Sequence, residues 1–437
     1  MAKTYESYKD SGIAWIGEIP SEWKVKRLGN FYNPRNEKVS DKDFAPLSVT
    51  MKGIVPQLET AAKTNDGDNR KLVRKGDFAI NSRSDRRGSC GISEYDGSIS
   101  LINTVLCPKG KMDAGFYNWL FHTTMFADEF YKWGHGIVDD LWTTKWSDMK
   151  NIYVVEPPMQ EQHSIASFLD TKCGEIDSLI SLQEEMISEL QAYKQSVITE
   201  AVTKGLDPNA KMNCCASREK NDACISSSET QPAIERKFKD SGVEWIGEIP
   251  ETWKYAKLKN IINYIESGVS VNAGLEEVGP NDIGVLKTSS VSKNVFIPYE
   301  CKKVFENEIN RVSCPVKANT IIVSRMNTPE LVGACGYVDR DYDNIFLPDR
   351  LWQVHFIESV YVKYYWYYLI SKRTKSYFSS LSSGTSSSMQ NISQPQFQGA
   401  PIAVPPLSEQ QAIASYLDEK TSQIDSLISL KQQKIDE

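Results

Sequence analysis

The sequence predicts an α+β protein built by duplication, with two mixed, strand-rich α/β domains joined by two long antiparallel helices. Two repeated segments predict this architecture. Segment 8–30 recurs as 238–260 with 14 of 23 positions identical, and segment 157–189 recurs as 405–437 with 19 of 33 identical. The long stretches between them barely match. The chain therefore repeats its framework and lets two central blocks differ.

The divergent blocks, 31–156 and 261–404, contain short β-rich runs such as LVRKGDFAINS, TIIVSR and RLWQVHFI, separated by Gly, Asn and Asp turns. An aromatic segment near the end of each block, 116–121 and 361–370, fits a helix or a strand, because alternation alone does not decide. The predicted order is a first domain over 1–156, a central helix over 157–204, a flexible linker over 205–237, a second domain over 238–404 and a C-terminal helix over 405–437.

The segment after each Pro-Pro predicts a helix, because its apolar residues follow the four-then-three spacing of a coiled-coil seam. Gln183, Lys194 and Lys431 are polar seam positions that restrict register, and Ser408 with Gln411 resembles a capping box. The residues predicted to form the helix pair and the subunit interface are Ile176, Ile180, Ile187, Leu190, Ile424, Ile428 and Ile435.

The second helix stops at Glu437, the position equivalent to Glu189. Leu190, Tyr193, Val197 and Ala201 of the first helix are therefore expected to lack an opposing helix. Such an exposed apolar strip would favour self-association.

Composition is that of a globular protein of two or three domains, with 437 residues, 40% hydrophobic and 24% charged. No stretch is apolar enough to span a membrane, and the amino terminus has no secretory signal. A cytoplasmic protein with reduced cysteines is expected. The net charge of −7 hides its distribution, because segments 157–204 and 405–437 carry −5 and −3 while the two domains are nearly neutral.

Catalytic constellations are missing from the sequence. It has no GxxxxGK[ST] phosphate loop, no GxGxxG turn and no [DNS]-P-P-[YFW] motif, and its four histidines and nine cysteines have no metal-ligand spacing. We therefore expect no enzymatic activity and no bound metal. An enzyme in its own right is the least supported interpretation.

With no catalytic motif in the sequence, recognition of a binding partner is the remaining class of function. Arginine is the residue that best reads guanine in the major groove of DNA. SRSDRRGSCG (82–91) and SRMNTPELVGACG (324–336) place Arg83 and Arg325 at comparable strand ends. The alternative interpretation is a solvated β-hairpin with a structural glycine. The residues predicted to contact DNA are Arg70, Lys71, Arg83, Arg86, Arg87, Lys302, Arg325, Lys372 and Arg373.

The chain resembles the specificity subunit of type I restriction–modification systems. The resemblance rests on the paired openings DSGIAWIGEIPSEW and DSGVEWIGEIPETW and on the paired helix entries PPMQEQHSIASFLDTKCGEIDSLI and PPLSEQQAIASYLDEKTSQIDSLI. It implies two target-recognition domains that each read one half of a split, asymmetric sequence in double-stranded DNA. It also implies an antiparallel helix pair that docks two modification subunits.

The resemblance further implies that no cofactor binds this chain. S-adenosylmethionine is expected on the modification subunits, and ATP and Mg on separate restriction subunits. A rival interpretation is an assembly or anti-restriction protein that binds modification subunits without specifying a target.

Overall fold

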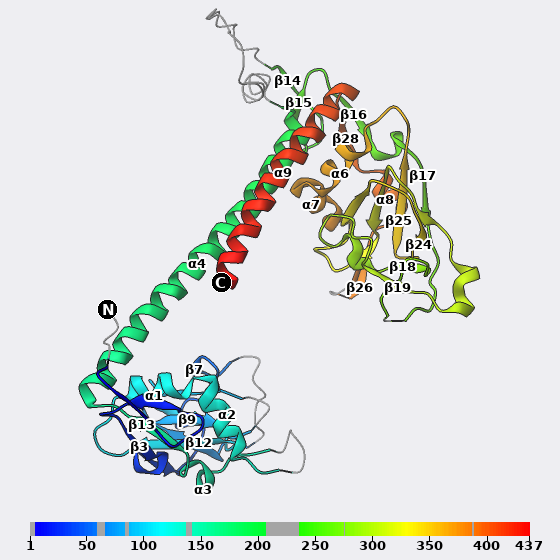
Figure 1. Ribbon diagram of the computed structural model, residues 1–437. Coiled ribbons are helices and arrows are strands. Elements are labelled where there is room, and N and C mark those ends of the chain that lie inside the picture. Colours follow the sequence, from blue (N-terminus) through cyan, green and yellow to red (C-terminus); the bar gives the residue numbers. More distant parts are fainter. Residues whose placement is uncertain are drawn as a thin grey trace, which may run out of the picture. The chain divides into compact units, whose positions relative to one another are not determined.

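The computed structural model describes residues 5–58, 66–83, 87–136, 142–206, 236–274, 276–386 and 389–437 (Figure 1). It divides into two compact units, Met1–Leu179 and Ile180–Glu437. The division falls inside helix α4 (Met159–Lys204), so the predicted central helix is not a body of its own. Most of the predicted linker, 207–235, lies outside the described residues. Both units combine helices with small sheets, which confirms the predicted α+β class.

Unit 1 contains a four-stranded antiparallel sheet in the order β10-β9-β12-β4, a three-stranded sheet in the order β11-β8-β5, and the pairs β1–β2, β3–β13 and β6–β7. Its strands are β1 (Tyr8–Asp10), β2 (Glu18–Pro20), β3 (Lys24–Arg27), β4 (Tyr32–Arg35), β5 (Lys38–Val39), β6 (Leu47–Thr50), β7 (Gly53–Pro56), β8 (Arg70–Val73), β9 (Phe78–Asn81), β10 (Cys90–Ile92), β11 (Gly97–Ile99), β12 (Asn103–Pro108) and β13 (Tyr153–Glu156). Its helices, besides the first part of α4, are α1 (Ala114–Phe121), α2 (Thr124–Lys132) and α3 (Trp146–Met149).

Unit 2 contains sheets in the orders β17-β25-β21-β23, β19-β18-β24-β20 and β22-β27-β26, and the pairs β14–β15 and β16–β28. Its strands are β14 (Phe238–Asp240), β15 (Glu248–Pro250), β16 (Lys254–Lys257), β17 (Ile262–Ser267), β18 (Gly284–Leu286), β19 (Cys301–Lys303), β20 (Pro315–Val316), β21 (Thr320–Ser324), β22 (Met326–Asn327), β23 (Cys335–Val338), β24 (Tyr342–Phe346), β25 (Leu351–Phe356), β26 (Ser383–Ser386), β27 (Met389–Asn391) and β28 (Pro401–Val404). Its helices are α6 (Val362–Ile370), α7 (Lys372–Leu381), α8 (Gln394–Gln398) and α9 (Leu407–Asp436), with the last part of α4.

No helix in the described part of the chain is long and apolar enough to cross a membrane.

The two aromatic segments that the sequence left ambiguous are helices. Segment 116–121 lies within α1, whose N-cap Asp113 accepts a hydrogen bond from the Phe116 amide at 2.9 Å. Segment 361–370 forms α6, in which seven of nine residues are buried. A helix that is apolar on nearly every face shows no amphipathic period, so the pattern of α6 was not visible in the sequence.

The repeated segments form the same structure in both units. Strand β3 pairs with β13 with Arg27 opposite Tyr153, and β16 pairs with β28 with Lys257 opposite Pro401. These partners are equivalent in the two repeats. Equivalent positions thus build one two-stranded framework in each unit, although most of the paired residues differ.

Each framework fastens the first turn of a long helix through a buried glutamine. The Gln162 amide donates to the Pro157 carbonyl at 2.8 Å and accepts from the Asp113 backbone amide at 3.0 Å. Gln410 makes the equivalent bonds to Pro405 and Tyr361, at 2.9 and 2.8 Å. Both glutamines are at most 4% exposed, so water does not reach these buried carbonyl and amide groups. The glutamine side chains satisfy their hydrogen bonds in place of water.

A tryptophan and a glutamate add a second bond beside each glutamine. The Trp23 indole donates to Glu161 at 3.0 Å, and the Trp253 indole donates to Glu409 at 2.9 Å. The predicted capping box is wrong: α9 begins after Pro406, which makes no side-chain cap, so Ser408 lies inside the first turn and not at the N-cap.

Replacing Gln410 by Ala should destabilise unit 2 by about 1–3 kcal/mol, because the Tyr361 amide and the Pro405 carbonyl lose their buried partner. Chemical denaturation of the full chain measures this. Gln411→Ala, an exposed neighbour on the same helix, is the matched control. Equal stabilities of the two variants would contradict the assignment.

Candidate nucleic-acid interface

In unit 1, the Ser-Arg motif lies where central strand β9 ends. The Ser82 amide donates to the Ile102 carbonyl at 3.2 Å, and the Thr144 amide donates to the Ser82 carbonyl at 2.9 Å. Arg83 then bridges to Thr143, in the segment that follows the helices. The Arg83 side chain is exposed, and no partner for its guanidinium is found among the described residues.

In unit 2, the equivalent motif lies at the end of central strand β21. The Arg325 amide donates to the Arg350 carbonyl at 3.2 Å, and the Ile392 amide donates to the Arg325 carbonyl at 2.9 Å. Strand β22 continues from Arg325 and pairs with β27, with Met326 opposite Asn391. A segment that follows the helices again folds back onto the Ser-Arg end.

The Ser-Arg motifs therefore occupy the same place in two sheets of the same strand order, although the surrounding blocks barely match. Their arginines differ. Arg325 is half-buried and its Nε donates to the Asp349 carbonyl at 2.9 Å, so part of this guanidinium holds the Pro348–Arg350 turn. Arg350 itself is exposed, without a side-chain partner in the described residues.

Sequence analysis missed Arg350. The sequence does show a Pro-Asp-Arg turn between two predicted strands, which is the signal that could have identified Arg350. In the structure this turn lies beside the end of the preceding central strand. The candidate reading edge thus consists of Arg83 and Thr143 in unit 1, and of Arg325, Arg350 and Asn391 in unit 2.

Arg70 and Lys71 do not belong to this edge, which corrects the prediction for both. Arg70 is 4% exposed, and its guanidinium donates to the Ser98 hydroxyl at 2.9 Å and to the Ser98 carbonyl at 3.0 Å. The Lys71 ammonium donates to the Asn103 carbonyl at 2.6 Å. Burial lowers the pKa of both side chains. They stabilise the domain and are not available to DNA.

The remaining basic residues of the predicted patch are also partly used within the fold. Arg87 forms an ion pair with Asp128 and lies over the Tyr131 ring, 5.0 Å from its centroid. Arg86 lies outside the described residues. Lys302 is half-buried on β19, in a different sheet from Arg325, so those two residues do not form one patch.

Lys372 and Arg373 open helix α7, whereas the Ser-rich hairpin follows its other end. They are therefore not part of the reading edge. Arg373 donates to the Ile246 carbonyl at 2.8 Å, and Lys372 is exposed.

The second part of α4 and helix α9 pack antiparallel in unit 2 (Figure 1). Lys431 donates to Gln183 at 3.3 Å and Lys194 to Asp425 at 2.7 Å, so residue numbers fall along α9 as they rise along α4. Gln183 and Lys431 are equivalent residues of the repeat. Their contact places a local two-fold axis of the helix pair between them.

The antiparallel order corrects part of the expectation of an unpaired strip. Ala201 is 4% exposed and Val197 packs on the same cluster as Ile413 and Leu417, because the start of α9 lies opposite the end of α4, whereas Tyr193 is 58% exposed as expected. Ile424 is buried. The other predicted seam residues of this unit, Ile180, Ile187, Leu190, Ile428 and Ile435, are half-buried, whereas Ile176 is 53% exposed in unit 1. Self-association stays a prediction.

The outward side of the helix pair carries a separate apolar set. Leu182 and Tyr193 on α4 and Leu427 and Leu430 on α9 are between 49% and 58% exposed. Since the seam residues are largely occupied by the helix pair itself, this outward face is the better candidate for contact with another subunit.

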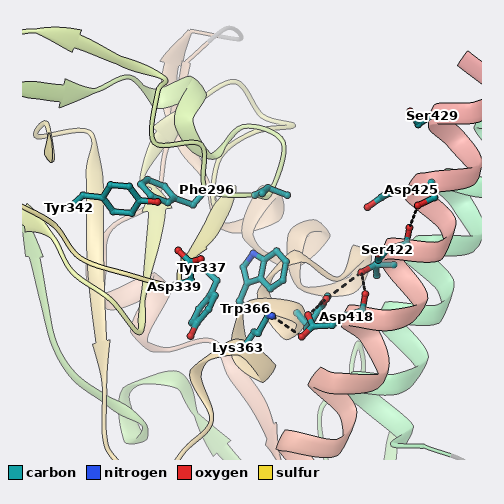
Figure 2. A pocket seen from close by; sticks show the side chains of 14 residues that line it. Phe296, Tyr337, Asp339, Tyr342, Lys363, Trp366, Asp418, Ser422, Asp425 and Ser429 are labelled. Carbon is teal, nitrogen blue, oxygen red and sulfur yellow. Dashed lines mark hydrogen bonds and ion pairs between the residues drawn. The ribbon is translucent and has the colours of Figure 1, made fainter. Parts of the chain in front are cut away.

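A cavity of about 680 Å³ lies between α9 and the sheets of unit 2 (Figure 2). Lys363 forms an ion pair with Asp418 at 2.7 Å, and the Tyr367 hydroxyl donates to the same carboxylate at 2.8 Å. In unit 1, Trp119 donates to the equivalent Asp170 at 2.8 Å. These aspartates fasten each domain to its helix.

The comparisons with known proteins fit this geometry. Residues 250–437 match the family model described as the type I restriction modification DNA specificity domain. The chain is 25% identical, over 95% of its own length and 89% of the relative's, to the specificity subunit of the type I restriction enzyme MjaVIII of Methanocaldococcus jannaschii. It is 28% identical, over 42% of its length, to the EcoEI specificity subunit of Escherichia coli, of which this alignment spans 31%.

A solved chain from a study of complex assembly and conformational transition of the type I R-M system has the same fold, with a TM-score of 0.63 at 14% identity, covering 95% of this chain and 94% of that one. Residues 250–437 therefore carry the type I restriction modification DNA specificity domain, and the chain as a whole is similar in sequence to type I specificity subunits. The rival assembly or anti-restriction interpretation is not favoured.

Arg70→Ala and Arg83→Ala should affect stability very differently. Loss of Arg70 leaves Ser98 without two buried bonds and should cost about 1–3 kcal/mol of unfolding free energy. Loss of the exposed Arg83 side chain should change it by less than about 0.5 kcal/mol. Denaturant titration of both variants checks this, and equal losses would disprove the distinction.

Proposed function

We propose that this chain selects a bipartite, asymmetric DNA sequence for a type I restriction–modification complex, with each divergent domain reading one half. The observation that carries the proposal is the contrast within each unit. The framework contacts of Gln162 and Gln410 are equivalent bond for bond, whereas the Ser-Arg edges present different side chains in the same place. Because the Ser-Arg edges of the two units differ while the framework around them is the same, each unit reads a different half-site.

The two exposed arginines are the proposed base readers. Arg83 and Arg350 each have a guanidinium without a partner in the described residues, at the end of a rigid central sheet. A guanidinium donates two parallel hydrogen bonds to guanine in the major groove, which makes its contact sequence-specific. Arg325 acts through its neighbour, because its bond to the Asp349 carbonyl holds the Arg350 turn.

We infer that the chain is the non-catalytic member of the complex. S-adenosylmethionine would bind to two modification subunits that methylate adenine, and ATP and Mg to restriction subunits. A cytoplasmic location belongs to the same proposal. The outward face of the helix pair, Leu182, Tyr193, Leu427 and Leu430, is the proposed docking surface for modification subunits.

Selection from a randomised duplex library tests the proposal. The full chain, assembled with purified modification subunits, should enrich two different short sequences separated by a fixed number of unread positions. Enrichment without any consensus would contradict a specificity role. Methyl transfer by the chain alone would contradict a non-catalytic one.

Arg83→Ala and Arg350→Ala should each relax preference in only one half-site and should lower affinity for the target by about 1–3 kcal/mol. Binding to duplexes mutated in one half at a time measures this. Lys434→Ala on the exposed end of α9 controls for loss of charge. Weaker binding to all sequences alike would show phosphate contacts instead of base reading.

Leu430→Asp should abolish co-purification with modification subunits while leaving the stability of the chain unchanged, because this side chain is 52% exposed and outside the helix seam. Ser429→Asp, its exposed neighbour, carries the same charge and should retain the subunits. Retention by both variants would place the docking surface elsewhere.

A further inference from the structure

Unit 2 contains a second cavity, of about 670 Å³, between the end of α4 and the start of α7. We call it the α4/α7 notch. The wall on α4 consists of amides, hydroxyls and one ion pair. Its lining residues are Ser188, Gln191, Ala192, Gln195, Ser196, Thr199, Glu200, Thr203, Lys204, Lys372 and Arg373.

The notch has a net positive charge that no group within it neutralises. Lys204 is paired with Glu200 at 3.7 Å, so these two charges offset each other. Lys372 is exposed, and no ion pair or hydrogen bond of its ammonium is found among the described residues. Arg373 is bonded only to carbonyls, those of Ile246 at 2.8 Å and Trp245 at 3.4 Å, so it keeps its full charge.

The carbonyl bonds also hold the Arg373 guanidinium in place. A guanidinium has five N–H donors, and the bonds to unit 2 use only one of its terminal nitrogens, Nη1. The others remain for a ligand at the notch. Thr199 and Thr203 donate their hydroxyls to their own helix, so these oxygens can only accept further bonds. Among the described residues of the lining, the donors left for a ligand are the Lys372 ammonium, the remaining N–H groups of Arg373, the side-chain amides of Gln191 and Gln195, and the hydroxyls of Ser188 and Ser196.

The two cavities of unit 2 differ in charge. The cavity in Figure 2 is lined by three aspartates and one lysine, Asp339, Asp418, Asp425 and Lys363, whereas the α4/α7 notch has two cations in excess. The notch is therefore the more favourable of the two for a polyanion. On α4 the positively charged region ends before Ser188, because the acidic residues Glu184 and Glu185 lie one turn earlier on the same face. The surface that attracts an anion is therefore confined to the notch.

We propose that the α4/α7 notch binds one or two backbone phosphates of the DNA beside the half-site that unit 2 reads, without reading bases itself. This inference rests on the proposed function. Amide, hydroxyl, lysine and arginine groups are the usual phosphate partners in protein–DNA complexes and carry no sequence information. Helix α7 has ten residues, so the notch lies about 15 Å from the hairpin of the reading edge, or roughly four base pairs along DNA.

The salt dependence of binding tests the notch. The full chain, assembled with modification subunits, is titrated with its target duplex at several salt concentrations. Lys372→Gln should reduce the magnitude of the slope of log affinity against log salt by about one, and Lys372→Gln with Arg373→Gln by about two. The selected sequence should not change. Lys434→Gln, the matched control on α9, should keep the wild-type slope.

Neutral methylphosphonate linkages locate the contact. Placed singly on both sides of the half-site that unit 2 reads, they should weaken wild-type binding at one or two adjacent linkages, and the double variant should lose nothing further there. Equal losses for both proteins at every linkage would overturn the proposal. Lys372→Gln removes no bond of the fold, so it remains informative if Arg373→Gln destabilises unit 2.

The outcomes separate this inference from the proposed function. A wild-type complex without a split consensus would contradict the proposed function, while the slope comparison still tests the notch. An unchanged slope with an intact consensus would overturn the notch alone. Loss of modification subunits from the double variant, with DNA binding unchanged, would assign the notch to an acidic protein segment and also overturn it.

Discussion

A buried glutamine at the first turn of each long helix is the constraint on which both recognition domains depend. Gln162 and Gln410 each bond a carbonyl before the helix and a backbone amide at the start of an aromatic helix. A buried amide left without these partners would cost about 1–3 kcal/mol for each lost bond, so the angle between domain and helix is strongly specified. With the frame fixed in this way, the sheet edges can change side chains without disturbing it.

The repeated frame was readable from sequence because Trp23 and Trp253, Glu161 and Glu409, and Gln162 and Gln410 lie in segments that match at more than half of their positions. The seam of the helix pair was readable from its period, as buried Ile424 shows. The helical conformation of α6 could not be predicted, since a helix that is buried on nearly all faces shows no amphipathic periodicity in its sequence. The fold class could therefore be predicted from the repeat, whereas the internal structure of the divergent blocks could not.

Charge was the least readable property of the candidate site. Counting basic residues predicted a patch around Arg70, but that guanidinium is buried against Ser98 and Arg87 is paired with Asp128. Burial and pairing depend on contacts distant in sequence. The arginines left free, Arg83 and Arg350, are single residues at strand ends, and the notch charge comes from Lys372 and Arg373 at a helix start. The net charge of −7 is thus compatible with local attraction of DNA.

The account's central claim is that each half of the target is read by one domain on an unchanging frame. Exchanging residues 31–156 for the corresponding block of another family member, and then selecting targets from a randomised library, tests it most directly. The account predicts that one half of the selected sequence changes while the other half and the spacing remain. A change in both halves would contradict it.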